Sequence, residues 1–271
     1  PGGAFVRVVR EDPTVPGLLY AGTEKGLFVS YDDGDDWQSL DLNLPAVPIT
    51  DLRVREDALA VATQGRAFWV LDDLFVVRQA AAANAKAPVH VYVPPALAMG
   101  RPGSSAGSFE GENPSSDLPI YYYLGEAVPA EGSLTIEVLD VDGTVLRRYS
   151  SEETDQDRCR LDNQDPRRPL TIDYPATDAG LQRWHWDLHR DDVRCTDDHI
   201  LFEGYGGPPV APRRYTVRVS AGEASATAPV AVLPDPRSGA TSEELDAWVA
   251  MQTRIAAMLE AVLGALDGAR E

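Results

Sequence analysis

Short apolar runs separated by turn residues fill the first part of the chain, and they restrict it to a fold built from β-strands. The runs recur at a spacing of roughly 8–12 residues, and each has the length of one strand. The first three lie at residues 5–9, 18–22 and 26–30, and only a short alanine run at 80–83 departs from this pattern. We therefore expect residues 1–93 to form an antiparallel all-β domain of about eight strands.

A second β domain is predicted from residue 118 to residue 236, after a linker over 94–117 that is rich in Pro, Gly and Ser. Asp142-Gly143 stands between two apolar runs and predicts a tight hairpin. Apolar and polar residues alternate over 183–188, which is the pattern of a half-buried strand. Six or seven such strands predict a β-sandwich of the immunoglobulin or fibronectin type.

The tail, residues 241–268, is predicted to be the one long helix. Thr241 and Glu244 have the spacing of a capping box, and Gly268 is a suitable stop. Apolar residues recur at helical spacing along one broad face: Leu245, Trp248, Val249, Ile255, Leu259, Val262, Leu263 and Leu266. Because this face is broad, we expect it to pack either on the sandwich or on a partner helix outside this sequence.

The most specific motif is Ser-x-Asp-x-Gly-x-x-Trp at residues 30–37. Asp32 is a short acceptor that can fold back onto backbone N–H groups of a tight turn. Gly34 can take the positive φ that such a turn needs, and Trp37 can bury a large ring as the next strand begins. We predict that Ser30, Asp32, Gly34 and Trp37 pin a hairpin between two strands, which is a structural role.

This motif resembles the Asp-box, or BNR repeat, of β-propeller proteins, which include sialidases, xyloglucanase-type glycoside hydrolases and sortilins. Residues 19–23 and 26–30 look like the two strands before an Asp-box hairpin. Residues 63–73 look like the closing blade of sortilin-like "glycosyl hydrolase BNR repeat" proteins. In that family a β-sandwich and a terminal helical segment follow the propeller, so the resemblance implies the C-terminal portion of such a protein.

The resemblance also implies a partial propeller, because residues 1–93 suffice for only about two blades. A blade takes four strands, and closed propellers have about 4–8 blades. Two blades alone leave unpaired sheet edges and a bare inner face. We therefore expect the remainder of the propeller, in the same or a separate chain, as a partner. The alternative is that residues 1–93 close on themselves as a small sandwich.

Charge and cysteine content restrict the partners and the compartment. The chain has 43 acidic and 24 basic residues, which give a net charge of -19. Such a chain repels phosphate backbones and anionic membranes, so we expect neither nucleic-acid binding nor membrane insertion. A disulfide between Cys159 and Cys195, the two cysteines, would imply a secreted or periplasmic protein, whereas two free thiols would allow the cytoplasm.

We predict no catalytic residue, no cofactor and no metal site. The acidic turn at 32–36 lacks the ligand spacing of an EF-hand loop, and Asp72-Asp73 is read as a strand-end pair. The sequence therefore favours a non-catalytic binding or scaffold region for a protein, peptide or glycan. The alternatives are the accessory C-terminal part of a sialidase- or xyloglucanase-like glycoside hydrolase, and a purely structural domain of a larger chain.

Overall fold

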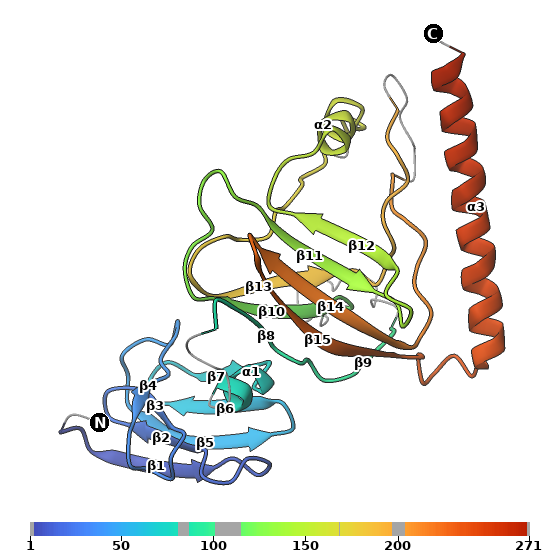
Figure 1. The fold of residues 1–271 in the computed structure, drawn as a ribbon. Helices are drawn as coiled ribbons and strands as arrows, with labels where there is room; N and C mark the ends of the chain where they lie inside the picture. Colours follow the sequence, from blue (N-terminus) through green and yellow to red (C-terminus); the bar gives the residue numbers. More distant parts are fainter. Residues whose placement is uncertain (1–2, 81–86, 101–114, 168, 197–203, 270–271) are drawn as a thin grey trace. The chain divides into compact units, whose positions relative to one another are not determined.

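The computed structural model describes residues 3–80, 87–100, 115–167, 169–196 and 204–269 (Figure 1). The described chain is mostly β, with several antiparallel sheets and one long C-terminal helix. It divides into two compact units, Pro1–Ala83 and Asn84–Glu271. We refer to these as the first and the second unit.

Two antiparallel sheets share one core in the first unit. Each sheet is a meander in which strands that follow one another in sequence are neighbours. The first sheet contains β1 (Val6–Glu11), β2 (Leu19–Thr23), β3 (Leu27–Ser30) and β4 (Gln38–Ser39), and the second contains β5 (Ile49–Arg55), β6 (Ala58–Thr63) and β7 (Phe68–Leu71). A short helix, α1 (Phe75–Ala80), follows β7.

The two sheets approach each other closely at Gly22. A Cβ atom at this position would lie 2.6 Å from Cγ2 of Ile49 on β5 and 2.7 Å from Cγ1 of Val8 on β1. Only glycine fits there, because real Cβ contacts are longer than this. The shared core on either side of this contact contains buried residues of both sheets, among them Leu18, Tyr20, Leu27, Val29, Leu52, Leu59 and Val61.

The two sheets also repeat the same strand pairing. In the first sheet Leu19 pairs with Ser30, and in the second sheet Leu59 pairs with Leu71. The equivalent strands lie about 40 residues apart, a spacing that is typical of structural repeats. By this correspondence β7 is the counterpart of β3, and the second sheet has no described strand in the place of β4.

The turns before β3 and β7 are closed by equivalent threonines. The hydroxyl of Thr23 donates to the carbonyl of Gly26 at 3.0 Å, and the hydroxyl of Thr63 donates to the carbonyl of Ala67 at 2.7 Å. Each hydroxyl also accepts a backbone N–H from within its own turn. The second turn is one residue longer than the first, which hides the repeat from a fixed-spacing search of the sequence.

A buried carboxylate, Asp12, ties α1 to the rest of the first unit. Its Oδ1 accepts the N–H and the hydroxyl of Thr14 at 2.9 and 2.7 Å, and its Oδ2 accepts the Tyr20 hydroxyl at 3.1 Å and Nε of Arg78 at 2.9 Å. Burial alone would raise the pKa of Asp12, but the hydrogen bonds from Thr14 and Arg78 outweigh it and lower the pKa. Arg78 lies on α1 and also pairs with Asp57 at 3.2 Å.

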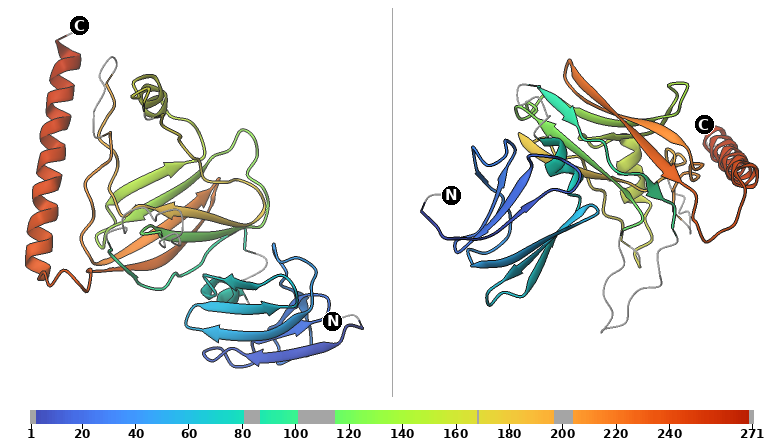
Figure 2. Two further views of the ribbon diagram at one scale, coloured as in Figure 1. Left: turned by 180° about the vertical axis from the view of Figure 1, so that it is seen from behind. Right: turned by 90° about the horizontal axis from the view of Figure 1, so that it is seen from below.

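The second unit contains two sheets in two layers (Figures 1 and 2). The three-stranded sheet has the order β13 (Gly180–Trp186), β10 (Leu118–Leu124), β8 (Val89–Val91). The five-stranded sheet has the order β12 (Val145–Ser150), β11 (Leu134–Leu139), β14 (Arg214–Ala221), β15 (Ala224–Leu233), β9 (Leu97–Ala98). All neighbours are antiparallel except β15 and β9.

The boundary between the units lies earlier than residue 93, where the sequence placed it. β8 pairs with β10 of the second unit, because its buried Val89 and Val91 complete the core there. β9 lies inside the expected linker 94–117, where it extends the five-stranded sheet through β15. The rest of that linker, residues 101–114, lies outside the described residues.

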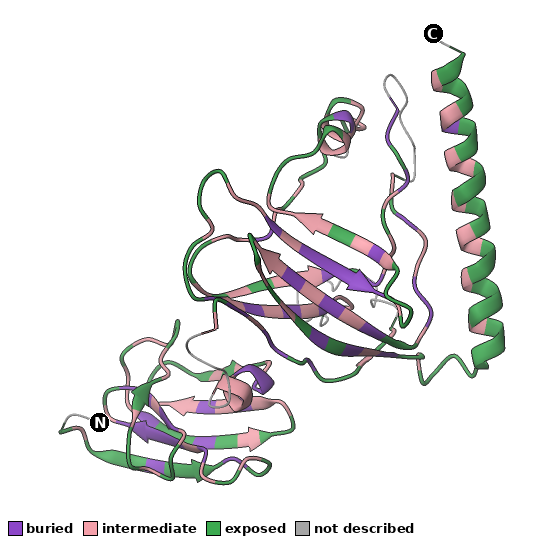
Figure 3. Ribbon diagram, viewed as in Figure 1, coloured by how far each residue is buried: buried purple, intermediate pink, exposed green. Residues whose placement is uncertain are grey.

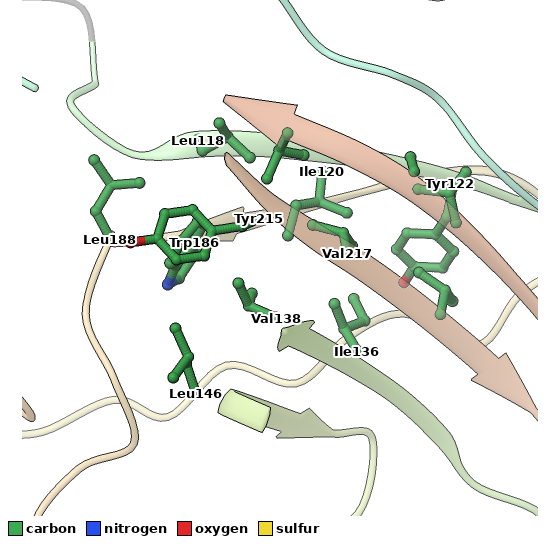
Figure 4. Packing of buried hydrophobic residues seen from close by; sticks show 14 of the residues in the cluster. Leu118, Ile120, Tyr122, Ile136, Val138, Leu146, Trp186, Leu188, Tyr215 and Val217 are labelled. Atoms are coloured by element: carbon green, nitrogen blue, oxygen red, sulfur yellow. The ribbon is translucent and has the colours of Figure 1, made fainter. Parts of the chain in front are cut away.

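The core of the second unit fills the space between its two sheets (Figure 4). Ile120 and Tyr122 point into it from one sheet, and Ile136 and Val217 point into it from the other (Figure 4). The predicted alternation over 183–188 is present, since Trp186 and Leu188 are buried while Arg183 and Asp187 are exposed. Trp186 also donates its indole N–H to the His189 carbonyl at 2.9 Å.

A helix that the sequence did not predict, α2 (Asp155–Asp162), follows β12. Thr154 caps it in a capping box with Asp157. Cys159 on α2 forms a disulfide with Cys195, as one of the two alternatives expected. A persistent disulfide fits an extracytoplasmic location.

The predicted terminal helix is present as α3 (Ser242–Gly268), and Thr241 and Glu244 form its capping box. Its apolar face is only partly buried, however (Figure 3). Leu263 is buried, whereas Trp248, Ile255, Val262 and Leu266 of the predicted face are exposed. α3 is also the one described helix that is long and apolar enough to cross a membrane, and little of it is buried.

We predict that Asp12→Asn lowers the stability of the first unit by about 2–4 kcal/mol, because it breaks a buried ion pair. Hydrogen exchange of the β2 and β3 amides would measure this effect. The pKa of Asp12 in the folded protein lies below the ordinary value of 3.8. The stabilisation that ionised Asp12 gives the first unit is therefore fully present above pH 3.8. It is lost as the pH falls through the folded pKa. Asp51→Asn is the control, since Asp51 forms an exposed pair with Arg10; equal effects of the two substitutions would contradict the prediction.

We predict that replacing Cys159 and Cys195 together by serine destabilises the second unit by about 2–4 kcal/mol, because the bond closes a loop over a sequence separation of 36 residues. Amides of α2 should lose protection from hydrogen exchange first, since the bond attaches this short helix. Reduction of the unmodified protein should reproduce the change, and α2 protection that survives both treatments would disprove a role for the disulfide in holding α2.

Candidate functional site

The second unit contains a cleft with a volume of about 1110 Å³. Its walls come from β12, from α2 and the chain that follows it, from β13 and the segments after it, and from Glu260 of α3. β12 and β13 are the edge strands of their sheets, and both edges lie on this side of the core. The cleft is therefore on the side where the edges of both sheets lie, and α2 covers it. Its volume suits a ligand of a few linked rings or residues.

Aromatic side chains form part of the wall. Tyr149 of β12 and Trp184 of β13 meet edge to face with ring centroids 5.2 Å apart, so the pair links the two sheet edges. The guanidinium of Arg147 lies 4.9 Å from the centroid of the Tyr149 ring. Tyr174 and Tyr205 also line the cleft, and both are half-buried.

One carboxylate of the cleft, that of Asp192, forms ion pairs with two arginines. Its Oδ1 accepts Nη1 of Arg147, and its Oδ2 accepts Nη1 of Arg160 on α2 at 2.8 Å. Burial would lower the pKa of Arg147, but Tyr149 and Asp192 outweigh it and raise the pKa. Both arginines are mostly buried, and the shared carboxylate keeps their planar donor groups fixed in place.

Three buried donors on cleft residues have no acceptor among the described residues. They are Nε of Arg147, Nε of Arg160 and Nε1 of Trp184. A buried donor without a partner costs about 1–3 kcal/mol. Each of these atoms is itself enclosed in the wall, so a ligand in the cleft would reach it only after side chains move.

Most of the cleft carboxylates already have partners. Asp157 caps α2, Asp191 accepts the N–H of Arg148 at 2.8 Å, and Glu260 accepts the N–H of Arg194. Together with Asp192, these acids fix the walls of the cleft in place. The arrangement favours holding a ligand over transferring a proton, which needs an acid or base free to meet the substrate.

The residues of the Ser30–Trp37 motif lie in the first unit, between β3 and β4. The hydroxyl of Ser30 donates to Asp32 at 2.7 Å and accepts the N–H of Gly34 at 2.9 Å. Asp32 also accepts the N–H of Asp36 at 2.9 Å, and this bond, with that from Ser30, lowers its pKa. Trp37 donates to the Gly34 carbonyl at 2.9 Å, and Gly34 has φ 97°. This is the pinned turn that the sequence predicted.

The sequence did not predict the cleft. Its central residues, Arg147, Tyr149, Arg160, Trp184 and Asp192, come from separate segments and form no local pattern. The one available signal was the Trp184 position in the alternating run, and it indicated core packing. Among the described residues, no group of three or more His, Cys, Asp or Glu side chains could hold a metal ion.

No protein-family model and no curated protein sequence matches this chain. Among solved structures, it is similar to the extracellular domain of a hybrid two-component system from B. thetaiotaomicron, with a TM-score of 0.21 and 10% sequence identity. The match covers 86% of this chain and 26% of that structure, so the chain spans about a quarter of the length of the protein it matches. The resemblance to Asp-box proteins therefore depends on the residues and geometry of this chain alone.

Proposed function

We propose that this chain is a non-catalytic binding and scaffold region of a larger secreted or periplasmic Asp-box propeller protein. In this proposal the first unit is two blades of the propeller, and the second unit is a sandwich of the immunoglobulin or fibronectin type whose cleft binds a glycan. The observation that carries the binding role is the cleft itself, with an aromatic wall and fixed arginines.

The repeated strand pairing supports two blades over a small closed sandwich. Sheets of a propeller repeat one after another with the same internal order, as the two sheets of the first unit do. A closed sandwich would cover its outer strands, yet Phe5, Val6 and Val9 at β1 are exposed. These apolar residues offer a surface to a preceding blade.

The second sheet also lacks the fourth strand of a blade. Among the described residues no strand pairs with the free edge of β7, where Phe68 is 81% and Val70 is 59% exposed. An open edge with apolar side chains invites another strand. We therefore assign this edge to a strand from the remainder of the propeller, in the same or a separate chain.

The chemistry of the cleft favours a glycan over a peptide. Aromatic rings can stack on the C–H faces of sugar rings, and planar guanidinium and amide groups can bind vicinal hydroxyls in pairs. Tyr174, Arg183 and Asn163 provide such groups along one cleft. The engaged carboxylates Asp157 and Asp192 favour binding over hydrolysis, which separates this proposal from an accessory part of a glycoside hydrolase.

We predict that the protein binds members of a glycan array without cleaving chromogenic glycosides. Tyr174→Ala and Arg183→Ala should each weaken the best binding at least tenfold, because each removes a cleft contact. Tyr123→Ala is the matched control. Tyr123 is a half-buried tyrosine on the face of β10 that points away from the core, and it does not line the cleft. Isothermal titration would measure the affinities. Glycan binding that is equally insensitive to all three substitutions, or turnover of a glycoside, would disprove this role.

We predict that the β7 edge becomes protected only when the rest of the propeller is present. In this chain the outer amides of β7 should exchange with solvent at least tenfold faster than those of β3, which β4 covers. In a longer form that contains the missing blades, β7 should reach the protection of β3. Hydrogen exchange followed by mass spectrometry measures both, and a β7 edge that stays open in the longer form would rule out strand addition there.

A further inference from the structure

We infer that α3 is a self-association surface, on which a second copy of this chain docks its own α3 to form a parallel two-stranded coiled coil. This goes beyond the proposed function, which involves the cleft and the first unit. The observation is an exposed apolar stripe along α3, made of Trp248, Met251, Ile255, Met258 and Val262, which are spaced 3, 4, 3 and 4 residues apart. We call these five residues the outer stripe.

The outer stripe is separate from the side of α3 that contacts its own unit. Val249 and the buried Leu263 lie on that contact side, roughly 100° around the helix from the stripe. Ion pairs hold the helix in this rotation: Arg213 binds Asp246 at 2.7 Å, and Arg194 binds Asp267. The members of the outer stripe are therefore left between 42% and 68% exposed.

The spacing of the outer stripe is that of a heptad repeat. Alternating steps of three and four residues keep a stripe on one side of two supercoiled helices, because they average 3.5 residues per turn. Trp248, Ile255 and Val262 are then at a positions, and Met251 and Met258 are at d positions. Two of the three a positions are β-branched, and β-branched residues at a are typical of two parallel strands when the d residues are not β-branched.

The charges near the outer stripe permit two copies to approach, although each has a net charge of -19. Positions beside the stripe are held by Ala247, Gln252, Leu259 and Ala261, with Arg254 the one charged neighbour. Asp246, Glu260 and Asp267 lie away from the stripe and bind Arg213 and Arg194. Glu244 lies in line with the stripe at its N-terminal end, where its carboxylate accepts the N–H and hydroxyl of Thr241 in the capping box. Like-charge repulsion is therefore weakest along this line.

The area of the outer stripe suits a dimer. Its exposed fractions, with that of Leu266, correspond to roughly 650 Å² per chain, so a pair would bury up to about 1,300 Å², within the usual range for a specific interface. A membrane is the weaker occupant of the same helix. Insertion of the helix would place the charged Arg254 and Glu260 in the apolar layer, which is unfavourable. The ion pairs of α3 with Arg194 and Arg213 would also have to break or bring the rest of the second unit to the membrane.

Sedimentation equilibrium of the chain tests the proposal. We expect a monomer–dimer equilibrium in which Met258→Glu raises the dissociation constant at least tenfold, because it places two carboxylates in the seam. Ala257→Glu is the control, since Ala257 is exposed on the side of α3 away from the stripe. Circular dichroism checks that both variants keep the helix. A chain that stays monomeric, or a dimer that both variants leave unchanged, would overturn the proposal.

Cysteine cross-linking tests the parallel direction. Cys159 and Cys195 are already joined, so Trp248→Cys or Val262→Cys introduces the one free thiol. In a parallel pair each variant cross-links to itself, and Met258→Glu added to either should abolish the product. Cross-links that form only between Trp248→Cys and Val262→Cys chains would mean an antiparallel pair and would contradict the proposed arrangement. Flotation of the protein with anionic or neutral lipid vesicles would instead point to a membrane and would also overturn it.

Discussion

A β-sheet leaves N–H and C=O groups unpaired along both of its edges. Whether each edge of this chain is covered or left open determines where a ligand or another strand can bind. In the second unit, the edge strands β12 and β13 lie on the same side of the core. The helix α2, attached by the Cys159–Cys195 bond, covers that side without closing it. The space that remains is the cleft. Side chains that an uncovered edge would expose to solvent, such as Tyr149 and Trp184, become its walls.

In the first unit, one sheet edge is covered by a short strand and another is left open. Its first sheet ends in β4, which the pinned turn between Ser30 and Trp37 brings back against β3. Its second sheet ends at β7, after which the chain forms α1. Asp12 binds Arg78 and fixes α1 in that place, so α1 does not take the position of the fourth strand. Among the described residues, β7 therefore ends the second sheet with a free edge. This free edge is the place where we propose that a partner strand pairs.

The sequence predicted the features that depend on local chemistry. The turn at 30–37 and the start of α3 were predictable because a few neighbouring side chains determine each of them. The boundary at residue 93 was wrong, because a strand as short as β8 has no local signal for the sheet it joins. Two blades were expected only through the family resemblance, and the residue-level repeat was not found because the turn at Thr63 is one residue longer than that at Thr23. The cleft could not be predicted at all, since Arg147, Arg160 and Asp192 meet only in the folded chain.

The broad apolar face predicted for the terminal helix consists of two stripes. This division allows ligand binding in the cleft and pairing of two α3 helices to occur in the same molecule. A helix that packs on one partner needs one stripe, so a second stripe beside the first needs a second partner. Glu260, which lines the cleft, lies nearly opposite the outer stripe on the helix. Pairing of two α3 helices would therefore leave Glu260 and its bond to Arg194 untouched. By bracing α3, such pairing would hold one wall of the cleft more rigidly, and less conformational entropy would be lost when a ligand binds.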